Sequence, residues 1–146
     1  MYCTKEDVYS QMDQRVVAGY LRNTGETGNE WETRLNDIIT KATDEINGYL
    51  RGRYSLPLNH VPGFIRDLCV RIVKYKIVSR KGYTSNSPEE GIAKDYQGVV
   101  KILEKIRDGD VDIGISTNEA ESVPSPKAIY STKKKYFGDN EFWRGF

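Results

Sequence analysis

The sequence PGFIRDLCVRIVKYKIVSRK, residues 62–81, places apolar side chains on almost every side of a helix. Proline suits the first helical turn, so we expect the helix to begin at Pro62. At helical spacing, one side holds Phe64, Ile65, Leu68, Cys69, Ile72, Tyr75 and Val78, and this side is widened by Val70, Val73 and Ile77. A helix with so much apolar surface must be covered from several directions. We therefore expect it at the centre of a helical bundle.

Helical signals also precede this segment. Thr4 is a candidate N-cap for a first helix, and a short helical piece is expected over residues 13–21. From residue 30 an apolar stripe continues for five turns, through Trp31, Leu35, Ile38, Ile39, Ala42, Ile46, Tyr49 and Leu50. This pattern predicts a long helix packed along one face.

A last helix is expected after the central one. Ser87 and Pro88 form a typical helix start, and Gly109 offers a left-handed C-cap. Val111, Ile113 and Ile115 then alternate with polar or small residues, as in a short extended segment. The sequence thus predicts a mostly α fold, a four-helix bundle over residues 1–115 with a short extended segment.

Composition limits the functions that the chain can have. Its 146 residues suit one domain, and 22 basic against 21 acidic residues leave a net charge of +1. That charge provides no general attraction to nucleic acid or membranes. No stretch approaches the roughly 18 apolar residues of a membrane span, and no leader is evident. A hydrophobic content of 38% is low for a domain that folds alone, which suggests that contacts with neighbouring molecules order part of the chain.

Signals for chemistry are missing from the sequence. It has no nucleophile elbow, phosphate-binding glycine loop or cysteine pair with metal spacing. Cys3 and Cys69 are too few for a disulfide framework and are expected to be reduced thiols, and His60 is the single histidine. We expect no enzyme, catalytic residue, metal site or cofactor.

Two polar regions leave alternatives open. Residues 23–29 form either a plain turn, which we favour, or a weak calcium loop, for which Glu26 is the only carboxylate. The central helix also carries Arg66, Arg71, Lys74, Lys76, Arg80 and Lys81. Their long stems can extend past the core edge to solvent, or they can form a positive rim that faces DNA or an acidic neighbour.

After Ser116 the sequence changes character, and we expect residues 116–146 to be an extended C-terminal docking tail. Its first part is polar, whereas its end holds the expected partner-binding anchors Tyr130, Tyr136, Phe137, Phe142, Trp143, Arg144 and Phe146. The basic run of Lys133, Lys134 and Lys135 is either a solvated linker or a contact for DNA or an acidic protein groove.

Three motifs carry a resemblance to a known family. The chain opens with Met-Tyr-Cys-Thr (1–4), its middle (42–58) runs through Gly-Tyr-Leu to Tyr-Ser-Leu-Pro-Leu, and it ends with Phe-Trp-Arg-Gly-Phe (142–146). In these features it resembles the small head–tail connector, or neck adaptor, proteins of Mu-like phages and prophages.

The resemblance implies a structural subunit of a homo-oligomeric ring, expected to be twelvefold, in the virion neck below the portal protein. It implies that the tail contacts the portal or a neighbouring subunit, and that the ring also meets the downstream neck or tail-terminator protein. DNA would pass through the lumen with transient contacts, and the candidate contacts for DNA or an acidic partner are Lys133, Lys134, Lys135, Arg51 and Arg53. The alternative is a small helical DNA-binding or regulatory domain that uses the basic central helix, although burial would leave little of that helix free.

Overall fold

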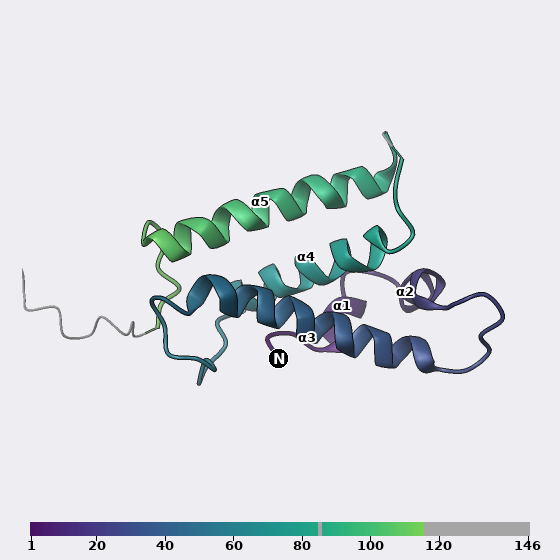
Figure 1. Ribbon diagram of the computed structural model, residues 1–146, viewed down its shortest axis with the longest axis horizontal. Coiled ribbons are helices and arrows are strands. Elements are labelled where there is room, and N and C mark those ends of the chain that lie inside the picture. Colours follow the sequence, from purple (N-terminus) through teal and green to yellow (C-terminus); the bar gives the residue numbers. More distant parts are fainter. Residues whose placement is uncertain (85, 116–146) are drawn as a thin grey trace, which may run out of the picture.

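Helices account for most of the residues that the structure, a computed structural model, describes, namely 1–84 and 86–115. In chain order they are α1 Lys5–Tyr9, α2 Gln14–Leu21, α3 Glu30–Leu50, α4 Gly63–Ser79 and α5 Pro88–Asp108 (Figure 1). Within this described part there is no strand, so the mostly α prediction is confirmed. The predicted docking tail, with its aromatic anchors and lysine run, lies outside the described residues.

Helix α4 lies at the centre, between α5 on one side and α3 with α1 on the other (Figure 1). It contacts all four other helices. Its buried side chains are Ile65, Leu68, Cys69, Val70, Ile72, Val73, Ile77 and Val78, which confirms the expected central helix. Phe64 departs from the prediction because it is 44% exposed: it lies in the first turn of α4, at the edge of the core. The helix begins at Gly63, with Pro62 as its N-cap.

The N-terminal region forms a helix and, over the predicted residues 13–21, a second short one, so the described residues hold five helices where the four-helix count took these two as one. Thr4 caps α1 in a reciprocal capping box: the Asp7 N–H donates to Thr4 Oγ1 over 3.2 Å, and the Thr4 N–H donates to Asp7 Oδ2 over 2.8 Å. Asp13 then caps α2 by accepting from the Arg15 N–H over 2.7 Å. A second N-cap so soon after the first explains why the chain starts a new helix.

Helix α5 has the predicted ends. Pro88 occupies its first turn, and Gly109 closes it at a φ of 95°, a conformation that favours glycine. The Ser87 hydroxyl makes no cap hydrogen bond; instead the Glu90 carboxylate accepts from the Asn86 N–H over 2.6 Å. The following segment, expected to be extended, is irregular: it bends at residues 110–111 and 114–115 and forms no strand, and its residue Ile113 is buried against the core.

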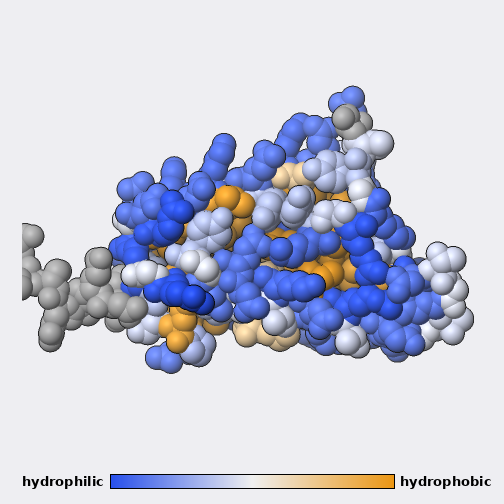
Figure 2. Space-filling model, viewed as in Figure 1, coloured by the Kyte–Doolittle hydropathy of each residue, from blue (hydrophilic) through white to orange (hydrophobic). Residues whose placement is uncertain are grey.

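The outer helices cover α4 with one apolar face each. Helix α3 buries Trp31, Leu35, Ile39, Ala42, Thr43, Ile46 and Leu50, and α5 buries Ala93, Val99, Leu103 and Ile106. The face seen in Figure 2 is mostly hydrophilic, with hydrophobic side chains visible in separate areas between the helices and at the lower edge. Within residues 1–84 and 86–115, no helix is long and apolar enough to cross a membrane.

Candidate interaction surface where the tail begins

The described part of the chain ends at one end of the helical bundle. The α3–α4 loop and the C-terminal end of α5 meet there, whereas the α2–α3 and α4–α5 loops lie at the opposite end (Figure 1). We name residues 47–58 together with 106–115 the tail-proximal end.

Arg53 closes helix α5 at the tail-proximal end. Its Nη1 donates to the Ile106 carbonyl oxygen over 3.1 Å, where the last turn of a helix leaves carbonyls without intrahelical donors. A Cβ atom on Gly109 would lie 2.9 Å from the same Nη1, so glycine also leaves room for the guanidinium. The Arg53 guanidinium carbon lies 5.8 Å from the centroid of the Tyr54 ring. Arg53 thus has a structural position, whereas its predicted neighbour Arg51 is exposed; the predicted DNA or acidic-partner contact of both arginines stays a prediction.

Tyr54 connects the α3–α4 loop to the segment that follows α5. Its side chain is 1% exposed, and its hydroxyl accepts a long hydrogen bond of 3.4 Å from the Ile113 N–H. Val111 and Ile115 pack against the same core as partly buried side chains. The chain is therefore held against the bundle up to the last residue that the structure describes.

Two hollows of similar size open on this surface. The first, of ≈ 560 Å³, adjoins the N-terminal segment, and the second, of ≈ 530 Å³, lies at the tail-proximal end. The second is lined by Asn47, Arg51, Tyr54, Ser55, Leu56 and Pro57, which include the Tyr-x-Leu-Pro motif noted in the sequence. The Asn47 Oδ1 accepts a hydrogen bond from the Tyr2 hydroxyl, so the N-terminus also supports its wall.

The charges near the exit point are mixed. Asp108, Asp110 and Asp112 are all exposed, and Arg107 pairs with Asp108 over 2.8 Å. The hydrogen bond from Arg107 lowers the pKa of the Asp108 carboxyl. A partner that binds here therefore meets both signs of charge and not a uniformly basic surface.

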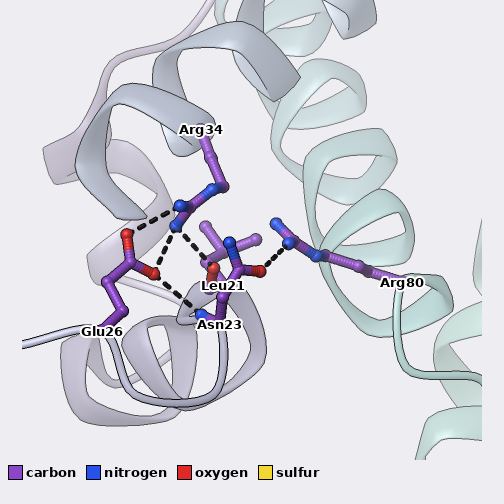
Figure 3. A network of polar contacts seen from close by, with 5 residues as sticks. All are labelled: Leu21, Asn23, Glu26, Arg34 and Arg80. Atoms are coloured by element: carbon purple, nitrogen blue, oxygen red, sulfur yellow. Dashed lines mark hydrogen bonds and ion pairs between the residues drawn. The ribbon is translucent and has the colours of Figure 1, made fainter. Parts of the chain in front are cut away.

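A polar network holds the opposite end of the bundle (Figure 3). Arg34 donates to both Glu26 carboxylate oxygens over 2.7 Å and to the Leu21 carbonyl oxygen over 3.0 Å. Glu26 also accepts from the Asn23 N–H over 2.8 Å, and Arg80 donates to Asn23 Oδ1 over 2.6 Å. This network ties the loop after α2 to both α3 and α4.

The network shows which partners the Glu26 carboxylate has in the loop at residues 23–29. The hydrogen bonds from Arg34 lower the pKa of Glu26 from 4.5 to about 2, so the carboxylate is committed to an ion pair. Among the residues that the structure describes, no three histidine, cysteine, aspartate or glutamate side chains are grouped as metal ligands. This geometry favours a plain turn over a calcium loop. The sequence alone did not indicate that Arg34 is the partner of Glu26.

The basic side chains of α4 are mostly engaged within the chain. Arg71 pairs with Asp67 over 2.8 Å and with Asp95 over 3.1 Å. Lys76 forms a further ion pair with Glu45 over 2.7 Å. Just beyond the end of α4, Arg80 donates a hydrogen bond to Asn23 and Lys81 donates one to the Gly19 carbonyl oxygen. This arrangement favours side chains that reach the core edge over a positive rim that binds DNA.

Comparisons with known proteins place these features in a family. The profile of the family described as "Bacteriophage Mu, Gp36" matches residues 2–130. The chain is similar to the Mu-like prophage FluMu protein gp36 of Haemophilus influenzae, with 30% identity over 109 residues that cover 75% of this chain and 73% of the relative. It is also similar to gene product J of Escherichia phage Mu, with 26% identity over 144 residues that cover 93% of this chain and 98% of the relative.

Proposed function

The chain belongs to the bacteriophage Mu Gp36 family of phage proteins, and from that premise we propose that it is a structural subunit of the head–tail connector. In this proposal, copies of the chain form a homo-oligomeric ring in the virion neck, between the portal protein and the downstream neck or tail-terminator protein. DNA passes through the lumen with transient, non-specific contacts. The subunit has no catalytic role and needs no cofactor.

The observation that carries this proposal is the way the chain is held where it leaves the bundle. Arg53 fixes the end of α5, and Tyr54 fixes the segment after it through Ile113. The sequence beyond residue 115 ends in a group of aromatic side chains, which bind well to apolar pockets of a partner. A firm exit point followed by aromatic anchors suits a subunit that must dock onto its neighbours in a fixed direction.

The alternative, a DNA-binding or regulatory domain, has less support. It requires the basic side chains of α4 to face a DNA groove, yet Arg71 and Lys76 make ion pairs within the chain and α4 is covered by all four other helices. Little of that helix is left to enter a groove.

The proposal is tested by deleting the gene from an inducible phage and examining the lysate by electron microscopy. We expect filled heads and free tails that are not joined, and expect the intact gene supplied in trans to restore joined particles. Lysates with normal joined particles after deletion would overturn the connector role. Binding of the purified chain to duplex DNA at increasing salt distinguishes the alternative, because a regulator would retain sequence-specific binding.

A further inference from the structure

The two cysteines of the chain, 66 positions apart in the sequence, meet inside the fold. Cys3 Sγ lies 3.1 Å from Cys69 Sγ, and the residues are only 2% and 0% exposed. Both are free thiols in the structure. Their separation along the chain hides this contact from the sequence, where they were interpreted as independent reduced thiols.

The two cysteines differ in the backbone that holds them, one in a helix and one in a non-helical segment. Cys69 lies within α4, in the middle of the core, whereas Cys3 lies in the non-helical segment before the N-cap of α1. The Tyr2 N–H donates to Thr43 Oγ1 of α3 over 3.1 Å, which holds this segment beside the helices. A disulfide has an S–S bond of ~2.05 Å, so the sulfurs must approach by roughly 1 Å. The segment at Cys3 can move by that amount without breaking a helix.

A small oxidant has a route to this pair. A cavity of ≈ 560 Å³ adjoins the N-terminal segment and is lined by Cys3 together with residues that include Met1, Asn36, Val61 and Arg66. A molecule the size of hydrogen peroxide fits such a space, whereas the covering of both thiols keeps a large disulfide reagent away.

The two thiols also affect each other's ionisation. The hydrogen bond between them lowers the pKa of Cys69 and raises the pKa of Cys3. Because the two sulfurs lie 3.1 Å apart, a sulfenic acid formed at either one is within reach of the other.

We propose that Cys3 and Cys69 form an oxidation site, which closes into an intramolecular disulfide when the folded chain meets a small peroxide. One of the two sulfurs attacks a peroxide oxygen and becomes a sulfenic acid, and the first water leaves. The other sulfur then attacks the oxidised one, an S–S bond forms, and the second water leaves. In total two thiols lose two hydrogen atoms and two electrons, and one peroxide becomes two waters.

The disulfide joins the N-terminal segment covalently to α4. It closes a long loop that contains α1, α2 and α3, and such a cross-link restricts the unfolded chain. We therefore expect a rise in Tm on the order of 10 °C on oxidation, reversed by a thiol reductant. This inference does not depend on the connector role, because it concerns the isolated chain.

The experiment uses the purified full-length chain, freed of reductant and treated with hydrogen peroxide. Remaining thiols are alkylated under denaturing conditions, and intact mass and proteolytic peptides are measured. We expect a monomer that has lost two hydrogen atoms and resists alkylation, a linked pair of peptides holding Cys3 and Cys69, and the rise in Tm. Cys3→Ser and Cys69→Ser are matched controls that should show no such rise.

Three results would overturn the proposal. They are a folded wild-type chain whose two thiols both remain open to alkylation, disulfides found only between chains, and sulfinic or sulfonic acid at either cysteine without the linked peptide. The wild-type measurement decides the matter even where a serine variant fails to fold, because the same sample is compared before oxidation, after oxidation and after reduction.

Discussion

Arg53 and Ile106, which are 53 positions apart, are joined by a hydrogen bond of 3.1 Å from the Arg53 Nη1 to the Ile106 carbonyl oxygen. This contact links the loop after α3 to the last turn of α5. Carbonyl groups in the last turn of a helix carry partial negative charge and favour a nearby cation. The Arg53 guanidinium therefore donates a hydrogen bond and also interacts favourably with the helix dipole. The exit of the chain from the bundle depends on this contact together with that of Tyr54.

Arg53→Ala should loosen this end of the bundle. We expect the free energy of unfolding to fall by about 1 to 2 kcal/mol, because a charge-assisted hydrogen bond and a packed stem are lost together. Urea unfolding measures the loss, and amide hydrogen exchange should increase at residues 109–113. The matched control is Arg51→Ala, an exposed neighbour whose loss should change stability by under about 0.5 kcal/mol. Equal effects of the two substitutions would contradict the position given to Arg53.

The Glu26–Arg34 pair predicts a pH dependence of stability. The folded-state pKa of Glu26 is lowered to about 2 from its ordinary 4.5, so the pair stabilises the fold above pH 4.5, and this contribution is lost as the pH falls from 4.5 towards 2. Glu26→Gln should therefore remove part of the decline in unfolding free energy across that range. A carboxyl titration by NMR should give a midpoint of about 2 for Glu26, rising towards 4.5 in Arg34→Gln. A wild-type midpoint near 4.5 would show that the pair is not formed.

Leu68→Asp tests the central position of α4. Leu68 is 1% exposed, and a carboxylate there would be buried without a partner, at a cost of several kcal/mol. We expect loss of cooperative unfolding or of soluble protein, followed by circular dichroism and gel filtration. Phe64→Asp on the same helix is the control, because Phe64 is 44% exposed and should accept the change. Folded, stable Leu68→Asp protein would contradict the central place of α4.

Local signals predicted much of this fold because they act over a few residues. The stripe of α4, the capping of α1 by Thr4 and the left-handed Gly109 were all recognisable from neighbours in the sequence. Phe64 was placed wrongly because periodicity identifies the buried face of a helix but not where neighbouring helices stop covering it. The helix expected over residues 13–21 is present as α2, with Asp13 as its N-cap.

The contacts of the candidate site needed the structure. Arg53 was expected only as a basic residue for DNA or an acidic partner, and no spacing rule indicates its bond to Ile106. Glu26 was considered for metal binding without its partner Arg34, and α1, α2 and α3 all lie between Cys3 and Cys69 in the sequence. Sequence periodicity describes each helix alone, whereas these contacts depend on which helices lie side by side.

The last prediction concerns the aromatic anchors, on which the connector proposal depends most directly. Interfaces concentrate their binding energy in a few aromatic and arginine side chains, so removing two anchors should cost on the order of 2 to 4 kcal/mol per contact, and this loss is repeated at every subunit of a ring. We expect Trp143→Ala with Phe146→Ala to leave the thermal unfolding of the purified chain unchanged. In a phage that lacks the gene, the double variant should accumulate filled heads and free tails, counted by electron microscopy against wild-type complementation. Asn140→Ala, which changes the same region but removes no aromatic surface, is the control and should support joining. Normal yields of joined, infectious particles from the double variant would show that these side chains are not the docking element, and the proposed role would lose its main mechanical support.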